Sequence, residues 1–165
     1  MLKKIGDYYL NMPIREVLDL RELTQEEYKE FETAGVARVF SDERIYQGRD
    51  VDFAGAIWKA FIGSTEGMIY RIALQAICPD ANSANDVFAF ANSYLLKEMG
   101  ELDMKHPAKE GFWYYPEGNV ILEQVCYEHK HIVQMCLTSS IIKHQAREMV
   151  NSLFALTKRY RVLNA

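Results

Sequence analysis

The chain has 165 residues, 49% of them hydrophobic and 25% charged, with three cysteines and a formal net charge of −4 at pH 7. This composition excludes a disordered chain, which is too poor in apolar residues to build a core. The odd number of cysteines and the lack of a leader-like apolar stretch also argue against a disulfide-rich secreted scaffold. We therefore expect one folded cytoplasmic domain spanning residues 1–165.

The first predicted helix follows an irregular start. Thr24-Gln25-Glu26-Glu27 has the S/T-x-x-E pattern, in which the threonine caps a helix and the glutamate reaches back to the threonine amide. A short helix to about Thr33 is expected, with Gly35 as its stop.

Residues 44–78 read as antiparallel strands, because β-branched and aromatic residues are punctuated by glycines. The alternation is clearest in 68–77, where Met68, Tyr70, Ile72, Leu74 and Ala76 point to one side and Arg71 and Gln75 to the other. A tight loop at 64–67 joins this strand to one predicted at 57–63.

A long central helix is predicted from Ser83 to about Met99. Its apolar residues recur every three or four positions, so one face should pack on the sheet. The uncharged run 87–96 is about half of the roughly 20 residues that a membrane-spanning helix requires, so no membrane span is expected.

The second half returns to strands and ends in a helix. Pro116 and Gly118 suit a type I turn between strands 112–115 and 119–127, and a further strand covers 131–138. Ser139 and Ser140 can cap a last helix that runs to about Tyr160. The predicted fold is α+β, with an antiparallel sheet of about five strands, a central helix on one face and N- and C-terminal helices flanking it.

The sheet is predicted to be apolar on both faces, so something must cover its second face. That cover is the first or last helix, a second subunit, or a ligand held in a pocket between sheet and helix. In the ligand interpretation the few polar side chains of these strands orient a small molecule. The candidate ligand-binding residues are Tyr70, Arg71, Gln75, Glu123 and Gln134.

The last helix carries an apolar stripe with spacings of four and three residues, as in heptad a and d positions. The stripe is either a dimer interface or a surface docked on the chain's own sheet. The aromatic run 112–115 offers side chains to both faces of an edge strand, which adds a second candidate contact. Core packing of two of the four aromatics Trp58, Trp113, Tyr114 and Tyr115 is equally expected. The predicted interface residues are Ile142, Met149, Leu153, Leu156, Tyr160 and Trp113.

Charge is unevenly spread along the chain. Residues 143–165 hold five basic side chains and one acidic one, a balance of +4, which leaves −8 for the remainder. A basic helix can bind nucleic acid, but the acidic whole and the absence of a reader motif make this the least favoured interpretation.

No motif for a nucleotide, a metal or a hydrolytic nucleophile occurs in the sequence. His129 and His131 lie on one side of a strand, but two ligands do not make a zinc site. No catalytic residue, metal or cofactor is therefore predicted. A motif-free active site would use a pair such as Glu123 as a base beside Arg71 as an oxyanion partner.

The leading hypothesis is a non-enzymatic binding protein that forms a homodimer, with a protein or small-molecule partner that the sequence does not identify. The alternatives are a small-molecule binding protein or small enzyme that uses the pocket between sheet and helix, and a nucleic-acid binder that uses the last helix.

Overall fold

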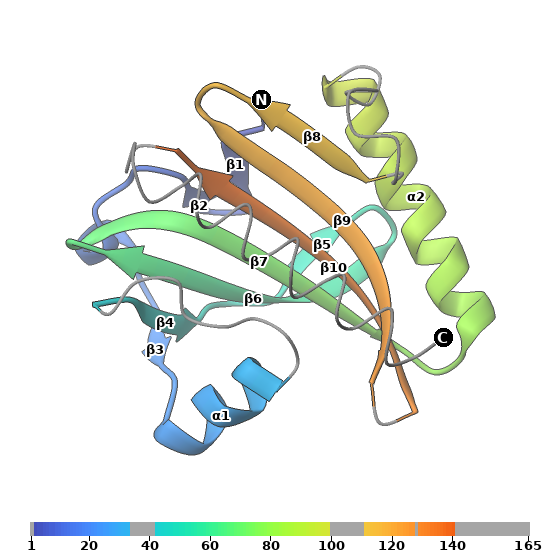
Figure 1. Cartoon of the computed structure of the whole chain (residues 1–165), viewed down its shortest axis with the longest axis horizontal. Helices are drawn as coiled ribbons and strands as arrows, with labels where there is room; N and C mark the ends of the chain where they lie inside the picture. Colours follow the sequence, from blue (N-terminus) through green and yellow to red (C-terminus); the bar gives the residue numbers. More distant parts are fainter. Residues whose placement is uncertain (1, 34–41, 100–110, 128, 141–165) are drawn as a thin grey trace.

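A computed structural model describes residues 2–33, 42–99, 111–127 and 129–140 of the chain. These residues form a two-stranded sheet, an eight-stranded antiparallel sheet and one long helix, α2 (Ala81–Met99) (Figure 1). None of the described helices is long and apolar enough to cross a membrane.

The large sheet is built around four long strands, β6, β7, β10 and β9, which lie side by side in that order. The main path has the order β3-β4-β6-β7-β10-β9-β8, and β5 pairs with β6 beside it. The strands of this sheet are β3 (Arg21–Glu22), β4 (Arg44–Gln47), β5 (Val51–Phe53), β6 (Ala56–Thr65), β7 (Met68–Cys78), β8 (Phe112–Tyr115), β9 (Gly118–Tyr127) and β10 (Lys130–Ser139).

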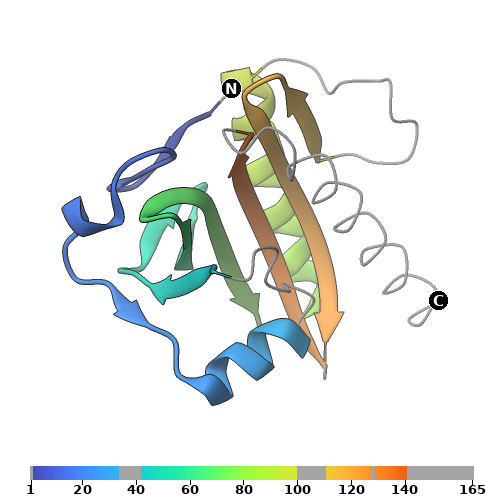
Figure 2. The same cartoon turned by 60° about the vertical axis from the view of Figure 1, so that its left-hand side comes forward.

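The N-terminal residues add small elements at one end of the sheet. A hairpin of β1 (Lys4–Ile5) and β2 (Tyr8–Tyr9) is followed by the short 3-10 helix η1 (Ile14–Glu16) and later by α1 (Gln25–Thr33). Ile5, Tyr8 and Leu10 bury their side chains in the main core. Figure 2 shows this N-terminal part on the side of the sheet away from β8 and β9.

The main core lies between the large sheet and α2, which contacts β7, β9 and β10. Ala84, Ala91 and Leu95 face the sheet from the helix. The sheet supplies alternate residues of its long strands, including Leu74, Leu122 and Met135, none of which is exposed. The alternation therefore places the odd residues of β7 and β9 and the even residues of β10 on the face opposite α2.

The predicted five-stranded sheet with N- and C-terminal flanking helices is wrong. The additional strands β3, β4 and β5 are two to four residues long, which is too short to show the two-residue hydrophobic period. They form because longer neighbouring strands supply hydrogen-bond partners. The predicted last helix lies outside the described residues.

The predicted helix start is also displaced. α2 begins at Ala81 rather than after Ser83, and the Asp80 side chain is the cap, because Oδ1 accepts a hydrogen bond of 2.8 Å from the Ser83 amide. That contact lowers the pKa of Asp80. Asp80 therefore lies between the end of β7 at Cys78 and the start of α2 at Ala81, and its side chain caps the helix.

Candidate functional site

The candidate site is the sheet face opposite α2, which we call the outer face and define by Arg71, Ala73 and Gln75 of β7 with their cross-strand neighbours. The register pairs Gln75 with Gln134 and Gln134 with Glu123. It also pairs Ala73 with Cys136 and Cys136 with Ile121. Four of the five predicted ligand-binding residues therefore share this face, drawn from strands that are far apart in sequence.

A buried ion pair occupies one end of the outer face. Arg71 Nη2 donates a hydrogen bond to Glu43 Oε1, and both side chains are at most 2% exposed. Gly63, the cross-strand neighbour of Arg71, leaves the space that the pair fills, since a Cβ there would lie 3.0 Å from Glu43 Oε1 and 3.3 Å from Arg71 Nε. Arg71 Nη1 has no hydrogen-bond partner among the described residues.

Tyr70 joins this cluster because of a break in strand register. Gly63 pairs with Arg71, and the next residue, Ser64, pairs with Ile69. Strand β7 therefore has one extra residue, Tyr70, between these two pairs, as in a β-bulge. The Arg71 guanidinium lies 5.7 Å from the centroid of the Tyr70 ring. The strict alternation predicted for 68–77 fails at this bulge, and Tyr70 and Arg71 become neighbours in the same charged cluster.

A second polar group crosses the centre of the outer face. Gln75 Nε2 donates to Gln134 Oε1 at 3.5 Å, and Gln134 Nε2 donates to Glu123 Oε1. All three side chains are half-buried. These hydrogen bonds satisfy the polar side chains of this row. The next cross-strand row of the outer face is apolar and consists of Ile77, Ile132 and Val125.

The electrostatics of the cluster keep its titratable hydroxyl and thiol neutral. Burial raises the pKa of Tyr70, and the negative Glu43 raises it further against the opposing effect of Arg71. Burial likewise raises the pKa of the Cys136 thiol, although Arg71 opposes this. Burial alone would lower the pKa of Arg71, but the neighbouring Tyr70, Glu43 and Cys136 side chains raise it overall. A protonated thiol is a weak nucleophile, so this arrangement suits hydrogen bonding better than covalent chemistry.

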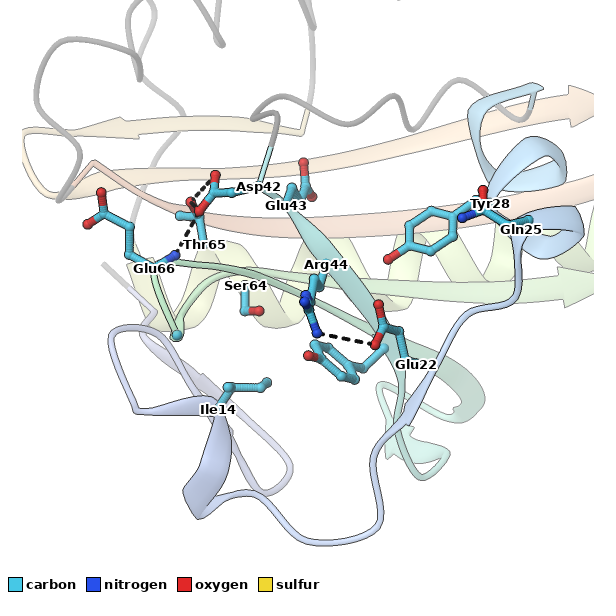
Figure 3. Close-up of a pocket in the computed structure, with 12 residues that line it drawn as sticks. Ile14, Glu22, Gln25, Tyr28, Asp42, Glu43, Arg44, Ser64, Thr65 and Glu66 are labelled. Carbon is cyan, nitrogen blue, oxygen red and sulfur yellow. Dashed lines mark hydrogen bonds and ion pairs between the residues drawn. The ribbon is translucent and has the colours of Figure 1, made fainter.

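An open pocket of about 660 Å³ lies at the β4 edge of the large sheet (Figure 3). Four carboxylates and one guanidinium line it, contributed by Glu22, Asp42, Glu43, Glu66 and Arg44. Three of the acids already have internal contacts. Glu22 lies 3.7 Å from Arg44, Glu43 pairs with Arg71, and Asp42 accepts hydrogen bonds from the β6–β7 turn.

Asp42 illustrates how this pocket is held together. Its carboxylate accepts the Thr65 hydroxyl at 2.8 Å and the Glu66 amide at 3.0 Å, and these bonds lower its pKa. Glu66 has a positive φ of 51°, a strained conformation for a residue with a side chain. The Asp42 carboxylate therefore stabilises the β6–β7 turn, so Asp42 has a structural role.

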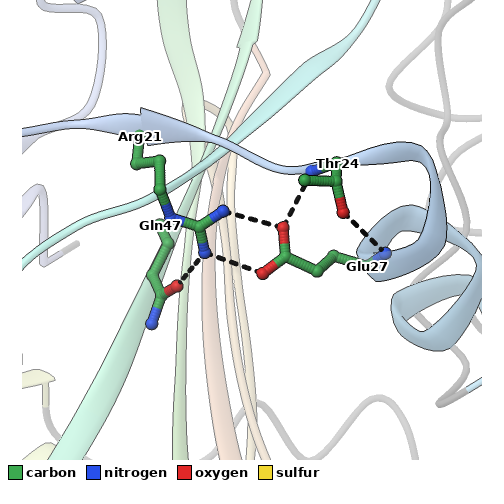
Figure 4. A network of polar contacts seen from close by, with 4 residues as sticks. All are labelled: Arg21, Thr24, Glu27 and Gln47. Carbon is green, nitrogen blue, oxygen red and sulfur yellow. Dashed lines mark hydrogen bonds and ion pairs between the residues drawn. The ribbon is translucent and has the colours of Figure 1, made fainter.

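Helix α1 closes the other side of the pocket through Gln25 and Tyr28. The predicted capping box is confirmed, since Thr24 Oγ1 accepts from the Glu27 amide at 3.3 Å and Glu27 Oε2 accepts from the Thr24 amide at 2.8 Å. Arg21 adds two hydrogen bonds of 2.8 Å to the same carboxylate (Figure 4). Tyr28 then packs on Ile45, and its hydroxyl accepts the Ile45 amide at 2.7 Å.

This capping network predicts a pH-dependent contribution to stability. Arg21 and the Thr24 amide lower the pKa of Glu27 from 4.5 to about 2. Its stabilisation is therefore complete above pH 4.5 and is lost as pH falls towards 2. We expect the difference in unfolding free energy between wild type and Glu27→Gln to shrink across that window. Urea denaturation at several pH values measures it, and a difference that grows on acidification would contradict the assignment.

The predicted interface residues fall into two groups. Ile142, Met149, Leu153, Leu156 and Tyr160 lie outside the described residues. Trp113 is on the edge strand β8, as expected, but it is only 1% exposed and belongs to the core beneath α2. The alternate position of Trp113 on β8 points its side chain towards the helix side of the sheet, where it packs in the core.

Glu43 is the main residue that the sequence interpretation missed. It directly precedes the short strand β4 and lies 28 positions from its partner Arg71. The only available signal was Arg71 itself, since an arginine in an otherwise apolar strand implies a buried acidic partner. Nothing local identifies which acid fills that role.

The chain has no significant match among protein-family models, curated proteins or solved structures.

Proposed function

We propose that this protein is a non-enzymatic binding protein that acts as a homodimer. The observation that carries the proposal is the exposure of large apolar side chains on both sides of the sheet. On the outer face, Ile57 is 70% and Ile77 is 54% exposed. On α2, Phe90 is 65% and Tyr94 is 38% exposed. Contiguous exposed apolar side chains are characteristic of surfaces that bind other molecules.

The outer face has the composition of a binding surface. Ile57 and Ile77 lie two residues beyond the register pair Lys59 and Gln75, so they extend β6 and β7 at the same end of the sheet. The hydrogen-bonded polar row of Gln75, Gln134 and Glu123 lies beside them. A surface that combines apolar side chains with hydrogen-bonding amides matches the mixed character of protein interfaces.

The chemistry of the outer face supports binding over catalysis. Arg71 is committed to Glu43 within the core, and the pKa values of Tyr70 and Cys136 are raised. A general acid or base works best with a pKa near the working pH, and a nucleophilic thiol needs a lowered one. These groups therefore favour structural and recognition roles.

Sedimentation equilibrium of the purified chain at micromolar concentrations tests the proposal. We expect a particle of twice the 19.1 kDa chain mass, in equilibrium with monomer on dilution. A chain that stays monomeric over the whole micromolar range would overturn the homodimer.

A further inference from the structure

The side of α2 that faces away from the sheet carries a regular line of exposed residues. Asp86, Phe90, Ser93 and Lys97 follow one another at spacings of four, three and four residues, and all four are exposed. This spacing keeps them on one stripe of the helix. The stripe lies opposite Ala84, Ala91 and Leu95, which bury the other side of α2 against the sheet.

Two aromatic side chains dominate this stripe and its border. Phe90 is 65% exposed, although it is a large apolar residue on a well-packed helix. Tyr94, next to the stripe, is held by Phe53 of β5, whose ring meets it edge-on with centroids 4.7 Å apart. The aromatic surface is therefore supported by the fold, which reduces the ordering cost when another molecule binds to it.

The stripe is self-complementary about a point between Ala91 and Asn92. If a second α2 lies antiparallel across that point, the numbering pairs Asp86 with Lys97 and Phe90 with Ser93 of the other copy. Each acid then meets a base and each Phe90 meets a small residue, and every contact occurs twice because the interface is isologous.

Resting on the proposed homodimer, we propose that the second copy binds at α2, with the two helices antiparallel about a two-fold axis near residues 91 and 92. Interdigitation of large and small side chains lets the helices approach closely. Antiparallel packing also places the positive end of each helix dipole beside the negative end of the other.

The charges alone have another explanation, which the aromatic residues do not share. A base in the last turn of a helix, such as Lys97, stabilises the helix dipole, whereas Asp86 is the sixth residue of α2 and lies beyond its first turn. That effect does not account for an exposed phenylalanine between them. A charge exchange separates the two accounts, because dipole effects depend on each helix alone, whereas pairing across the axis depends on both copies.

The test is sedimentation equilibrium of charge variants of the full chain. Asp86→Lys and Lys97→Asp should each raise the dimer dissociation constant about tenfold, because each places like charges opposite one another at two sites. The double variant Asp86→Lys with Lys97→Asp should restore the dissociation constant to within about twofold of wild type. Glu16→Lys, an exposed acid on η1, is the matched control and should leave it unchanged.

Phe90→Ala tests the aromatic contact in the same measurement. We expect the dissociation constant to rise about a hundredfold, because the residue is truncated at the centre of both halves of the interface. Leu18→Ala, which removes an 80% exposed apolar side chain elsewhere, is the control and should have no effect. Circular dichroism of each variant confirms that the fold is retained.

The outcomes separate this surface from the homodimer itself. A monomeric wild type overturns both. A wild-type dimer that is insensitive to the charge variants and to Phe90→Ala overturns the α2 surface and leaves the homodimer standing. If the α2 variants stay dimeric but the double variant Leu153→Glu with Leu156→Glu dissociates, the interface is the predicted C-terminal apolar stripe and not α2. If both single charge variants raise the dimer dissociation constant and the double variant does not restore it, the antiparallel pairing is also overturned.

Discussion

Replacing Arg71 with methionine is expected to lower the free energy of unfolding by about 3–5 kcal/mol, the cost of leaving one member of a buried ion pair without its partner. The Glu43 side chain is completely buried, and its carboxylate accepts a hydrogen bond from Arg71. Methionine fills part of the space beside Gly63 but brings no charge. Urea denaturation followed by circular dichroism measures the loss.

The double variant Arg71→Met with Glu43→Leu separates the ion pair from the packing that surrounds it. Since well-packed apolar residues can replace a buried pair with little loss, we expect the double variant to regain most of the stability lost in the single one. Additive losses in the two single variants and the double variant would show that Arg71 and Glu43 act independently, contrary to the geometry.

Replacing Gly111 with alanine is expected to destabilise the protein by about 2–5 kcal/mol, the sum of a positive-φ penalty and an overpacking penalty. Gly111 has a φ of 92°, which side chains rarely adopt. A Cβ there would also lie 2.1 Å from the backbone oxygen of Leu122. The clash is with backbone that belongs to the β9 ladder, so neither side can move without breaking strand pairing.

Gly67→Ala is the matched control for this prediction. Gly67 has a comparable φ of 74°, but nothing lies within 4 Å of the position that a Cβ would take. We expect it to lose only about 1–2 kcal/mol, the cost of the backbone conformation. The difference in unfolding free energy between the two variants, from thermal or urea denaturation, gives the cost of the clash between an added Cβ at Gly111 and the Leu122 backbone oxygen. Equal losses would show that this approach carries no penalty.

Where a pattern is local, it predicted structure well. The capping box at Thr24 and Glu27 needs only four consecutive residues, and both of its hydrogen bonds are present. The turn at Pro116 and Gly118 likewise produced the expected hairpin of β8 and β9. In both cases the partners are close in sequence, so little chain entropy opposes their contact.

The candidate site was predictable only in part. The two-residue period identified Gln75, Gln134 and Glu123 as polar residues on one side of their strands, and the register does align them. Tyr70 reaches the Arg71 cluster through the bulge opposite Gly63 and Ser64, which the alternation did not indicate. A bulge changes which face a residue occupies without leaving a signal in hydrophobic periodicity.

The sequence alone was sufficient to predict the elements whose information is local: the four long strands, the helix α2 and the turns. The short strands β3 to β5, the burial of Trp113 and the pairing of Glu43 with Arg71 became evident only from the three-dimensional packing. The physical reason is the range of the interactions. Periodicity and capping arise within a few residues, whereas edge pairing, strand register and buried charge partners depend on which distant segments pack together.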